Sequence, residues 1–259
     1  MSTRLQDKVA IVTGAGSGIG RACALRFAAE GARVMVCDIH QANAQIAVDE
    51  IVARGWNAIV HHADVTRIES VQEMVQAAVT HFGRLDILVS NAGGATPTPL
   101  ENISPDEYHR LIALNLDSVY YGVHAALPVM LAQGGGVFLS IASGAGLGAV
   151  TDLAIYGAAK AGMINLMRSV AVDYGSRGIR ANTIAPGPMD TPGLRAWLDT
   201  TPVGAAGYAA QVPVGRLGTA EDIAAAAAFL VSDDAAYVSG VVLPVDGAIH
   251  ARLASPNSN

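Results

Sequence analysis

Short apolar segments alternate with segments of helical periodicity over almost the whole chain. The apolar segments are rich in Val, Ile, Leu and Ala, as buried strands are. They span 8–14, 33–38, 57–65, 85–93, 135–143, 179–187 and 241–248. Helical spacing lies between them at 19–30, 41–54, 68–82, 106–131, 152–174 and 220–231. This alternation predicts right-handed β-α-β units, and hence a parallel sheet that is covered by helices on both faces.

The composition agrees with such a sheet. Of the 259 residues, 51% are hydrophobic and 15% are charged, as expected when helices bury both faces of a sheet. A chain of this length can fold as one α/β domain, so we expect residues 1–259 to form a single unit. Residues 187–218 are rich in Gly, Pro, Thr and Ala and are weakly structured, which is typical of a lid over a binding site. The polar tail 254–259 is expected to fray.

The charge pattern narrows the classes of partner. The formal net charge is −6 and no basic block occurs, so nucleic acid and anionic membranes are poor candidates. The first residues lack the apolar core of a signal peptide, and no apolar run reaches the roughly 18 residues of a membrane helix. We therefore expect a soluble, cytoplasmic protein in which Cys23 and Cys37 are buried and reduced.

A glycine-rich segment follows the first predicted strand and opens the first predicted helix. It reads TGAGSGIG over Thr13–Gly20. Glycines here permit a tight turn and a close approach of the backbone to a phosphate, and the helix N-terminus offers N–H groups to the anion. The spacing T-G-x-x-x-G-x-G in a strand–loop–helix context indicates a dinucleotide site. We expect the cofactor to contact Gly14, Ser17, Gly18, Ile19 and Gly20.

An acidic residue ends the second predicted strand. Asp38 is placed where a carboxylate can accept hydrogen bonds from the adenosine ribose hydroxyls. The same carboxylate would repel a 2′-phosphate, and the neighbouring Ser17 and Ile39 are neutral. We therefore expect NAD as the cofactor rather than NADP. The alternative for Asp38 is a solvated aspartate at a strand end.

A tyrosine and a lysine stand four residues apart in an otherwise apolar predicted helix. Tyr156 and Lys160 lie in the sequence YGAAK, so both point from the same helical face. Lys160 is one of only two lysines in a chain that otherwise uses arginine for its positive charges. Lysine is a compact charge whose pKa can be tuned, whereas arginine stays charged. The alternative is a core tyrosine beside a lysine that reaches the surface.

Together these features resemble the classical branch of the short-chain dehydrogenase/reductase family. The resemblance covers about residues 7–247 and includes further motifs in the order that the family shows. These are Asp64–Val65, SNAG at 90–93 with Ser90 in place of the first Asn of NNAG, Asn115 in LNL, Ser143, and APGPMDT at 185–191. The resemblance implies a single-domain, Rossmann-type doubly wound sheet. It also implies further cofactor contacts from Asp64, Val65, Asn91, Ala92, Gly93, Tyr156, Lys160, Pro186, Gly187, Met189 and Thr191.

The resemblance also implies a division of labour among the catalytic residues. Tyr156 would act as general acid and base in hydride transfer, with the phenol pKa brought down from its free value of ~10 by the nearby Lys160. Lys160 would also reach the nicotinamide ribose, and Ser143 would hydrogen-bond the substrate oxygen. Ser140, on the strand itself, ranks second to Ser143. Asn115 would hold a water for a proton relay, although its amide could instead bond the helix backbone.

The segments expected around the substrate are almost uncharged. They are 94–100, 144–150 and 188–218, which follow the fourth, fifth and sixth predicted strands. We expect substrate contacts from Ser143, Leu147, Tyr156, Leu194, Trp197 and Leu198. A neutral, fairly apolar secondary alcohol or ketone fits such surroundings better than a phosphorylated or CoA-linked compound. The apolar residues could instead pack the lid or a subunit interface.

Other classes of function are less well supported. An NADPH-dependent ketone reductase is opposed by Asp38, and a non-catalytic dinucleotide-binding regulatory protein by the intact Ser143, Tyr156 and Lys160. His61 and His62 are adjacent without an H-E-x-x-H motif, so we expect no metal site, and the chain lacks the G-x-S-x-G of serine hydrolases. The resemblance implies a homotetramer or homodimer built on helices 106–131 and 152–174, whereas composition alone would allow a monomer.

Overall fold

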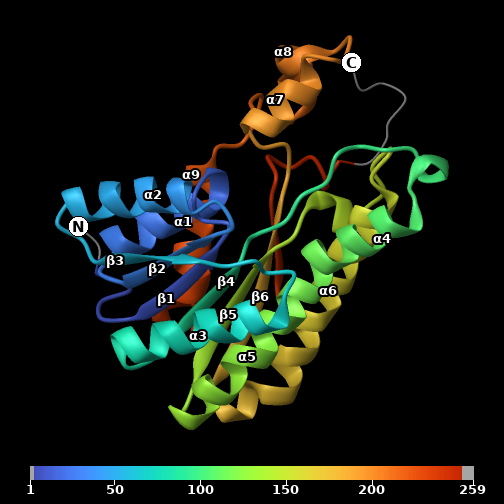
Figure 1. Cartoon of the computed structure of the whole chain (residues 1–259). Helices are drawn as coiled ribbons and strands as arrows, with labels where there is room; N and C mark the ends of the chain where they lie inside the picture. Colours follow the sequence, from blue (N-terminus) through green and yellow to red (C-terminus); the bar gives the residue numbers. More distant parts are fainter. Residues whose placement is uncertain (1–2, 253–259) are drawn as a thin grey trace.

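The computed structural model describes residues 3–252 and places their strands in one parallel sheet. The strand order is β3-β2-β1-β4-β5-β6-β7 (Figure 1). The bounds are β1 Val9–Thr13, β2 Arg33–Asp38, β3 Ala58–His62, β4 Ile87–Ser90, β5 Gly136–Ile141, β6 Ile179–Pro186 and β7 Val242–Val245. The winding direction reverses between β1 and β4, and a crevice opens at the carboxyl ends of strands at such a point. The predicted fold class, with about seven parallel strands, is confirmed.

Helices cover both faces of this sheet. One face carries α1 Gly18–Ala29, α2 Gln41–Ala53 and α9 Ala220–Val231, and the other carries α3 Ile68–Phe82, α5 Ser118–Ala132 and α6 Ala154–Tyr174 (Figure 1). Along β2, Val34 and Val36 pack in the core under α1 and α9, whereas Met35 and Cys37 pack in the core under α3 and α5. Burial on both faces explains why the strands are continuous apolar runs in the sequence. Cys23 and Cys37 are buried free thiols, as predicted.

The helix predicted over 106–131 is interrupted. The chain forms α4 Pro105–Ile112, then a π-helical turn Ala113–Asp117, then α5. Ser104 caps α4, because its side chain accepts a hydrogen bond from the N–H of Glu107 at 3.1 Å. The π-helical turn holds one extra residue per turn, and Asn115 lies at its centre with no exposed surface. Such turns are often found at functional sites.

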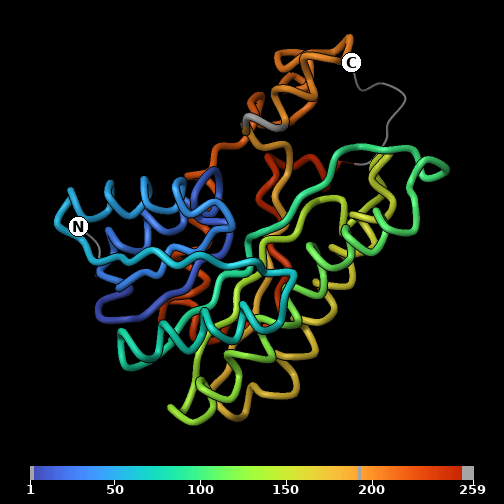
Figure 2. The backbone as a smooth tube through the Cα atoms, viewed as in Figure 1, coloured from blue at the N-terminus to red at the C-terminus, as the bar shows by residue number. Residues whose placement is uncertain are grey.

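The predicted lid is more ordered than its composition indicates. Within 187–218 the chain forms α7 Pro192–Leu198 and α8 Gly204–Gln211, which stand beyond the carboxyl end of the sheet (Figures 1 and 2). Thr191 starts α7 by accepting a hydrogen bond from the N–H of Leu194 at 3.2 Å. Backbone bonds close the base of the lid, since Asp190 donates to Gly218 and Gly218 donates to Pro188. Thr and Pro at the start of a helix account for α7.

Two sequence-based expectations concern the C-terminal tail and membrane-spanning helices. The tail 254–259, which was expected to fray, lies outside the described residues. Within 3–252, no helix is both long enough and apolar enough to cross a membrane.

Candidate functional site

A cavity of about 820 Å³ lies along the carboxyl ends of the central strands. It reaches from Asp38 at the end of β2 to Tyr156 and Lys160 on α6. Its volume is in the range of cofactor and ligand pockets. The structure brings the following expected cofactor-binding residues together in its lining: Gly14, Ser17, Gly18, Ile19, Asp38, Asp64, Val65, Asn91, Ala92, Gly93, Tyr156, Lys160, Pro186, Gly187, Met189 and Thr191.

The glycine-rich segment forms a tight loop at the N-terminus of α1. Gly14 has φ +61° and Gly18 has φ +52°, a conformation that favours glycine. Ser17 caps α1 without a side-chain hydrogen bond to the helix, so its side chain does not occupy the N–H groups of the first turn. This arrangement fits the diphosphate of a dinucleotide, because those N–H groups can donate to an anion.

One glycine of the expected set has a different role. Gly20 does not line the cavity. It packs against the loop instead, and a Cβ at this position would collide with the carbonyl of Gly14 and the side chain of Asn91. Gly20 therefore permits close packing of α1 under the loop. Asn91 stabilises the same loop by donating to the carbonyls of Thr13 at 2.9 Å and Gly14 at 3.1 Å.

Two carboxylates mark the end of the cavity that is far from α6. Asp38 accepts hydrogen bonds from the N–H groups of Gly16 and His40, each at 2.9 Å, so it also fixes the glycine-rich loop. It is half-buried rather than fully solvated. Asp64 accepts from the hydroxyl of Thr66 at 2.6 Å, and this bond holds the pKa of Asp64 below its usual value. Both carboxylates are therefore fixed acceptors.

Lys160 lies inside the protein rather than at its surface. Its side chain is 2% exposed, and Nζ donates a hydrogen bond to the carbonyl of Ile141 at 3.1 Å. Nζ is also 5.5 Å from the centroid of the Tyr156 ring. Burial disfavours the ammonium and lowers the pKa of Lys160 to about 7. The alternative of a surface-reaching lysine is excluded.

The pKa of Tyr156 differs from the sequence-based expectation. Burial of the phenol raises this pKa, and the hydrogen bond with Ser143 only partly opposes the increase. The expected lowering by Lys160 was wrong for this structure, because desolvation of a phenolate is the larger effect and burial disfavours the charge on Lys160 as well. Tyr156 is therefore set up as a neutral phenol that can donate a proton.

The two candidate serines are placed differently. Ser143, just after β5, accepts from the N–H of Ala145 at 3.1 Å, and it lines the cavity beside Tyr156, where its side chain partly opposes the rise in the pKa of the phenol. Ser140 is fully buried on β5 and hydrogen-bonds Thr183 at 2.9 Å, away from the cavity lining. The geometry therefore favours Ser143 as the group next to a substrate.

The side chain of Asn115 bonds backbone rather than facing the cavity. Its oxygen accepts from the N–H of Gly94 at 2.9 Å, and its amide donates to the carbonyls of Gly94 and Leu111, each at 3.0 Å. This is the backbone-bonding alternative that the sequence left open. Asn115 and Lys160 still meet at Gly93, because a Cβ on Gly93 would lie 2.8 Å from Asn115 Oδ1 and 3.1 Å from Lys160 Nζ.

A second cavity, of about 430 Å³, adjoins the first at Ser143 and Tyr156. Of the expected substrate residues, Leu194 and Trp197 line it, and Trp197 meets Tyr208 edge to face at 6.4 Å. Leu147 and Leu198 do not line it. Leu147 is 40% exposed on the surface, and Leu198 is 1% exposed because it packs inside the lid.

The sequence did not single out several residues that line the second cavity. Leu153, Ile249 and His250 lie outside the segments expected around the substrate, whereas Pro97 and Val150 lie within the expected 94–100 and 144–150. Ile249 and His250 follow β7, and nothing in the local sequence indicates that the chain returns there to the end of β5. No Asp, Glu, Lys or Arg occurs among the described residues that line this cavity.

The nearby charged groups are paired away from the second cavity. Arg195 forms an ion pair with Asp190 on the lid, and Arg216 forms one with Asp222 at the start of α9. Among residues 3–252, no three His, Cys, Asp or Glu side chains cluster in a way that could hold a metal ion.

Comparison with known proteins gives a consistent set of relatives. A family model described as enoyl-(acyl carrier protein) reductase matches residues 14–250. A cyclohexanol dehydrogenase of Acinetobacter sp. strain SE19 is 40% identical over 96% of this chain and 97% of its own length. A 2,5-dichloro-2,5-cyclohexadiene-1,4-diol dehydrogenase of Sphingobium indicum is 38% identical over 95% of this chain and 98% of its own. A 7α-hydroxysteroid dehydrogenase, solved with NADH and 7-oxo glycochenodeoxycholic acid, superposes with a TM-score of 0.90 at 38% identity, covering 95% of each chain.

Proposed function

This chain belongs to the short-chain dehydrogenase/reductase family of oxidoreductases, which bind a nicotinamide dinucleotide, and from this premise we propose that it is an NAD-dependent dehydrogenase of neutral secondary alcohols. The reaction is the reversible conversion of an alcohol and NAD⁺ into a ketone, NADH and a proton. The observation that carries the proposal is that Ser143 and Tyr156 line both cavities and so lie at their junction.

The choice of NAD rests on the end of the first cavity. Asp38 presents a fixed carboxylate there, and a carboxylate attracts ribose hydroxyls but repels a 2′-phosphate. Of the described residues that line this cavity, only Arg110 and Lys160 are basic. Arg110 pairs with Glu107 at 2.7 Å, and Lys160 lies on α6. No basic side chain of this lining is therefore placed to balance a 2′-phosphate.

Tyr156 exchanges the proton of the reaction. NAD supplies the hydride acceptor when it is bound. In ketone reduction, the neutral phenol of Tyr156 donates its proton to the developing alkoxide, and Ser143 donates a hydrogen bond to the same oxygen. In alcohol oxidation, Tyr156 must first lose its proton, and the Ser143 side chain, which opposes the rise in the pKa of Tyr156, stabilises the resulting phenolate, while Lys160 is placed to reach the nicotinamide ribose. Asn115 contributes by fixing Gly94 and the π-helical turn rather than by touching the substrate.

The second cavity sets the class of substrate. No Asp, Glu, Lys or Arg side chain lines its walls, and the aromatic rings of Trp197 and Tyr208, which meet edge to face, give it apolar surface. A hydroxyl on a ring fits this shape, and the relatives named for cyclohexanol, a cyclohexadiene diol and a hydroxysteroid support it. We therefore favour a cyclic secondary alcohol or ketone.

The apolar surface supports assembly into a homodimer or homotetramer. Tyr108 on α4, Tyr120 on α5 and Val172 on α6 are large apolar side chains that remain exposed in the single chain. Size-exclusion chromatography with light scattering tests this part of the proposal. We further propose that the protein works in the cytoplasm, in keeping with its acidic pI of about 5.6.

The first experiment is NAD reduction by the purified protein with cyclic, aromatic and aliphatic secondary alcohols. NADP, 3-oxoacyl and enoyl thioesters of acyl carrier protein, and the Tyr156→Phe variant are run in parallel. Turnover of a cyclic alcohol with NAD that disappears in the variant supports the proposal. Preference for NADP contradicts the role of Asp38, and turnover of the acyl thioesters alone would replace the substrate class. NADH binding without any turnover favours a non-catalytic protein.

A further inference from the structure

His250 connects the segment after β7 to the turn that carries Ser143. Its Nδ1 is 2.9 Å from the carboxylate of Asp246, and its Nε2 is 3.1 Å from the carbonyl oxygen of Gly144. His250 also lines the second cavity beside Ser143. Because a carbonyl oxygen and an ionised carboxylate can only accept a hydrogen bond, each ring nitrogen must carry a proton for its contact to form.

Asp246 holds the imidazole in place. The carboxylate is almost fully buried and also accepts hydrogen bonds from the N–H groups of Ala248 at 2.9 Å and His250 at 3.1 Å. Burial alone would raise the pKa of Asp246, but these hydrogen bonds outweigh it and the pKa is lowered. Ala248 has φ +71°, which is unfavourable for a residue with a side chain. The turn is therefore kept in a strained form that aims His250 at Gly144.

The carbonyl that His250 contacts belongs to a peptide unit with a second role. The N–H at the other end of this unit is that of Ala145, and it donates to the hydroxyl oxygen of Ser143 at 3.1 Å. The side chain of Ser143 in turn partly opposes the rise in the pKa of Tyr156. A donor that binds a carbonyl polarises its amide and strengthens the N–H as a donor. A continuous chain of hydrogen bonds thus runs from Asp246 to Ser143, the residue beside Tyr156 in the cavity lining.

The turn does not depend on His250 for its existence. The carbonyl of Gly144 also accepts from the backbone N–H groups of Leu147 at 2.9 Å and Gly148 at 3.1 Å. These two bonds hold the turn in any variant of His250. The imidazole adds a further, directional hydrogen bond to this carbonyl. It packs so closely against the backbone of Gly144 that a Cβ there would collide with the ring. Loss of His250 should therefore change the catalytic rate more than the fold.

From this geometry we infer that His250 is a positioning residue, which orients the Ser143 hydroxyl through the Gly144–Ala145 peptide. The inference rests on the proposed function, because it assigns Ser143 to the substrate oxygen. His250 supplies the hydrogen bond that keeps this peptide plane fixed while Ser143 shares its proton between Tyr156 and the substrate.

Two substitutions separate this role from simple anchoring of the chain end. The amide nitrogen of Gln can take the place of Nε2 and keep the contact with Gly144, whereas that of Asn takes the place of Nδ1 and keeps only the contact with Asp246. We expect His250→Gln to retain kcat within about threefold and His250→Asn to lower it about tenfold, with the Kd for NADH unchanged in both. His81→Asn, on exposed α3, is the matched control. Equal effects of Gln and Asn, or a larger effect of Gln, would overturn the inference.

A second readout works without any substrate. Amide hydrogen exchange of Ala145 should be several-fold faster in His250→Asn than in the wild-type protein and in His250→Gln, because the peptide plane is less constrained. Equal exchange in the three proteins would overturn the inference even if the rates differ. If the wild-type protein oxidises none of the alcohols, the proposed function fails by itself, and the exchange rates still decide whether His250 holds this peptide.

Discussion

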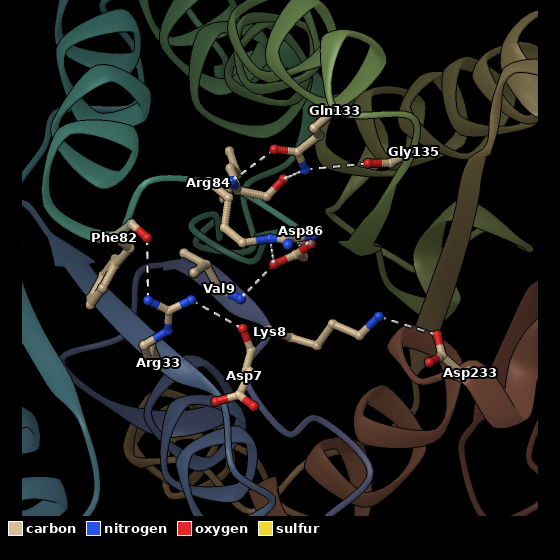
Figure 3. A network of polar contacts seen from close by, with 11 residues as sticks. Asp7, Lys8, Val9, Arg33, Phe82, Arg84, Asp86, Gln133, Gly135 and Asp233 are labelled. Atoms are coloured by element: carbon tan, nitrogen blue, oxygen red, sulfur yellow. Dashed lines mark hydrogen bonds and ion pairs between the residues drawn. The ribbon is translucent and has the colours of Figure 1, made fainter.

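Asp38 and Asp86 are both carboxylates at strand ends, but they lie at opposite ends of the sheet. Asp86 precedes β4 at the amino end, is 6% exposed, and accepts the N–H of Val9 at 2.8 Å and two nitrogens of Arg84 (Figure 3). Asp38 ends β2 at the carboxyl end and is held by N–H groups of the chain while its carboxylate lines a cavity. One carboxylate joins two strands, and the other is available to a ligand.

The surroundings of the two carboxylates show the same contrast. At the amino end, Arg33 donates to the carbonyls of Asp7 and Phe82 (Figure 3). The side-chain amide of Gln133 accepts from the N–H of Leu85 and donates to the carbonyl of the same residue. At the carboxyl end, Tyr156 and Lys160 are buried at a cavity, with pKa values that burial has shifted toward their neutral forms. Polar groups that pair with each other stabilise the sheet, whereas groups that line a cavity are left for chemistry.

Tyr156→Phe should break the functional end and leave the fold intact. Removal of the proton donor should lower kcat for the best alcohol about 10³-fold. The free energy of unfolding should change by only about 1 kcal/mol, because one hydrogen bond with Ser143 is lost. Steady-state kinetics and urea denaturation measure the two effects. Retention of more than a tenth of the activity would contradict the assignment of Tyr156.

Asp86→Ala should have the opposite profile. It leaves the N–H of Val9 without its acceptor and Arg84 without its ion pair, so we expect a loss of about 2 kcal/mol in the free energy of unfolding. The rate per folded molecule should stay within about twofold of the wild type. Asp49→Ala, at an exposed position of α2, is the control and should leave stability almost unchanged. A large rate defect in Asp86→Ala would refute the division between the two ends.

Asp38→Asn tests whether the carboxylate at the end of β2 selects the cofactor. Removal of its charge should lower the ratio of kcat/KM for NAD to that for NADP roughly 10- to 100-fold, because repulsion of the 2′-phosphate is lost. Asp64→Asn lines the same cavity and should weaken both cofactors alike. An unchanged ratio in Asp38→Asn would show that another group discriminates between them.

The smallest expected effects come from a comparison of the two lysines of the chain, Lys160 and Lys8, by the free energy of unfolding of their variants. The pKa of Lys160 is lowered to about 7 in the folded protein, so between about pH 7 and pH 10.5 the unfolded chain binds more protons and stability rises with pH. Below about pH 7, Lys160 is protonated in both the folded and the unfolded chain, so the full free-energy cost of burying its charge is present. Lys160→Met should therefore increase the free energy of unfolding by about 1–2 kcal/mol at pH 6.5, and this gain should shrink toward pH 10 while activity is lost.

Lys8→Met is the matched control at the other end of the sheet. Lys8 forms a partly exposed ion pair with Asp233 at 3.4 Å, so its removal should cost about 0.5 kcal/mol or less and leave no buried charge to relieve. Thermal unfolding at a series of pH values compares the two variants. A gain in stability for Lys160→Met that does not depend on pH would contradict a buried charge as its cause.

The sequence was informative where the local pattern decides the structure. The bounds of β2 and α3 were predicted to the residue, because apolar periodicity is a property of neighbouring residues. Most of the expected cofactor residues come together because they lie at or just after the carboxyl ends of parallel strands, which meet at one edge of the sheet, whereas Tyr156 and Lys160 come from α6.

The remaining features depend on contacts between distant segments. Gly20 packs against Gly14 and Asn91, and His250 reaches Gly144 from the far side of the chain, so neither role could be predicted from neighbours in the sequence. The direction of the Tyr156 pKa shift depends on how completely the phenol is buried. The pairing of Arg195 with Asp190 likewise became clear only when the lid proved to be helical.

The π-helical turn Ala113–Asp117 rotates the side chains of α4 about the helix axis relative to those of α5, compared with a continuous α-helix. An α-helix advances about 100° per residue, so one additional residue turns everything before it by that angle relative to everything after it. With the additional residue, Leu111 on α4 and Val119 on α5 are both buried, although a continuous helix would point its apolar stripe differently along its length. Deletion of one residue from this turn would restore α-helical pairing and turn the buried face of α4 away from the core, so the additional residue sets the direction in which α4 presents its side chains.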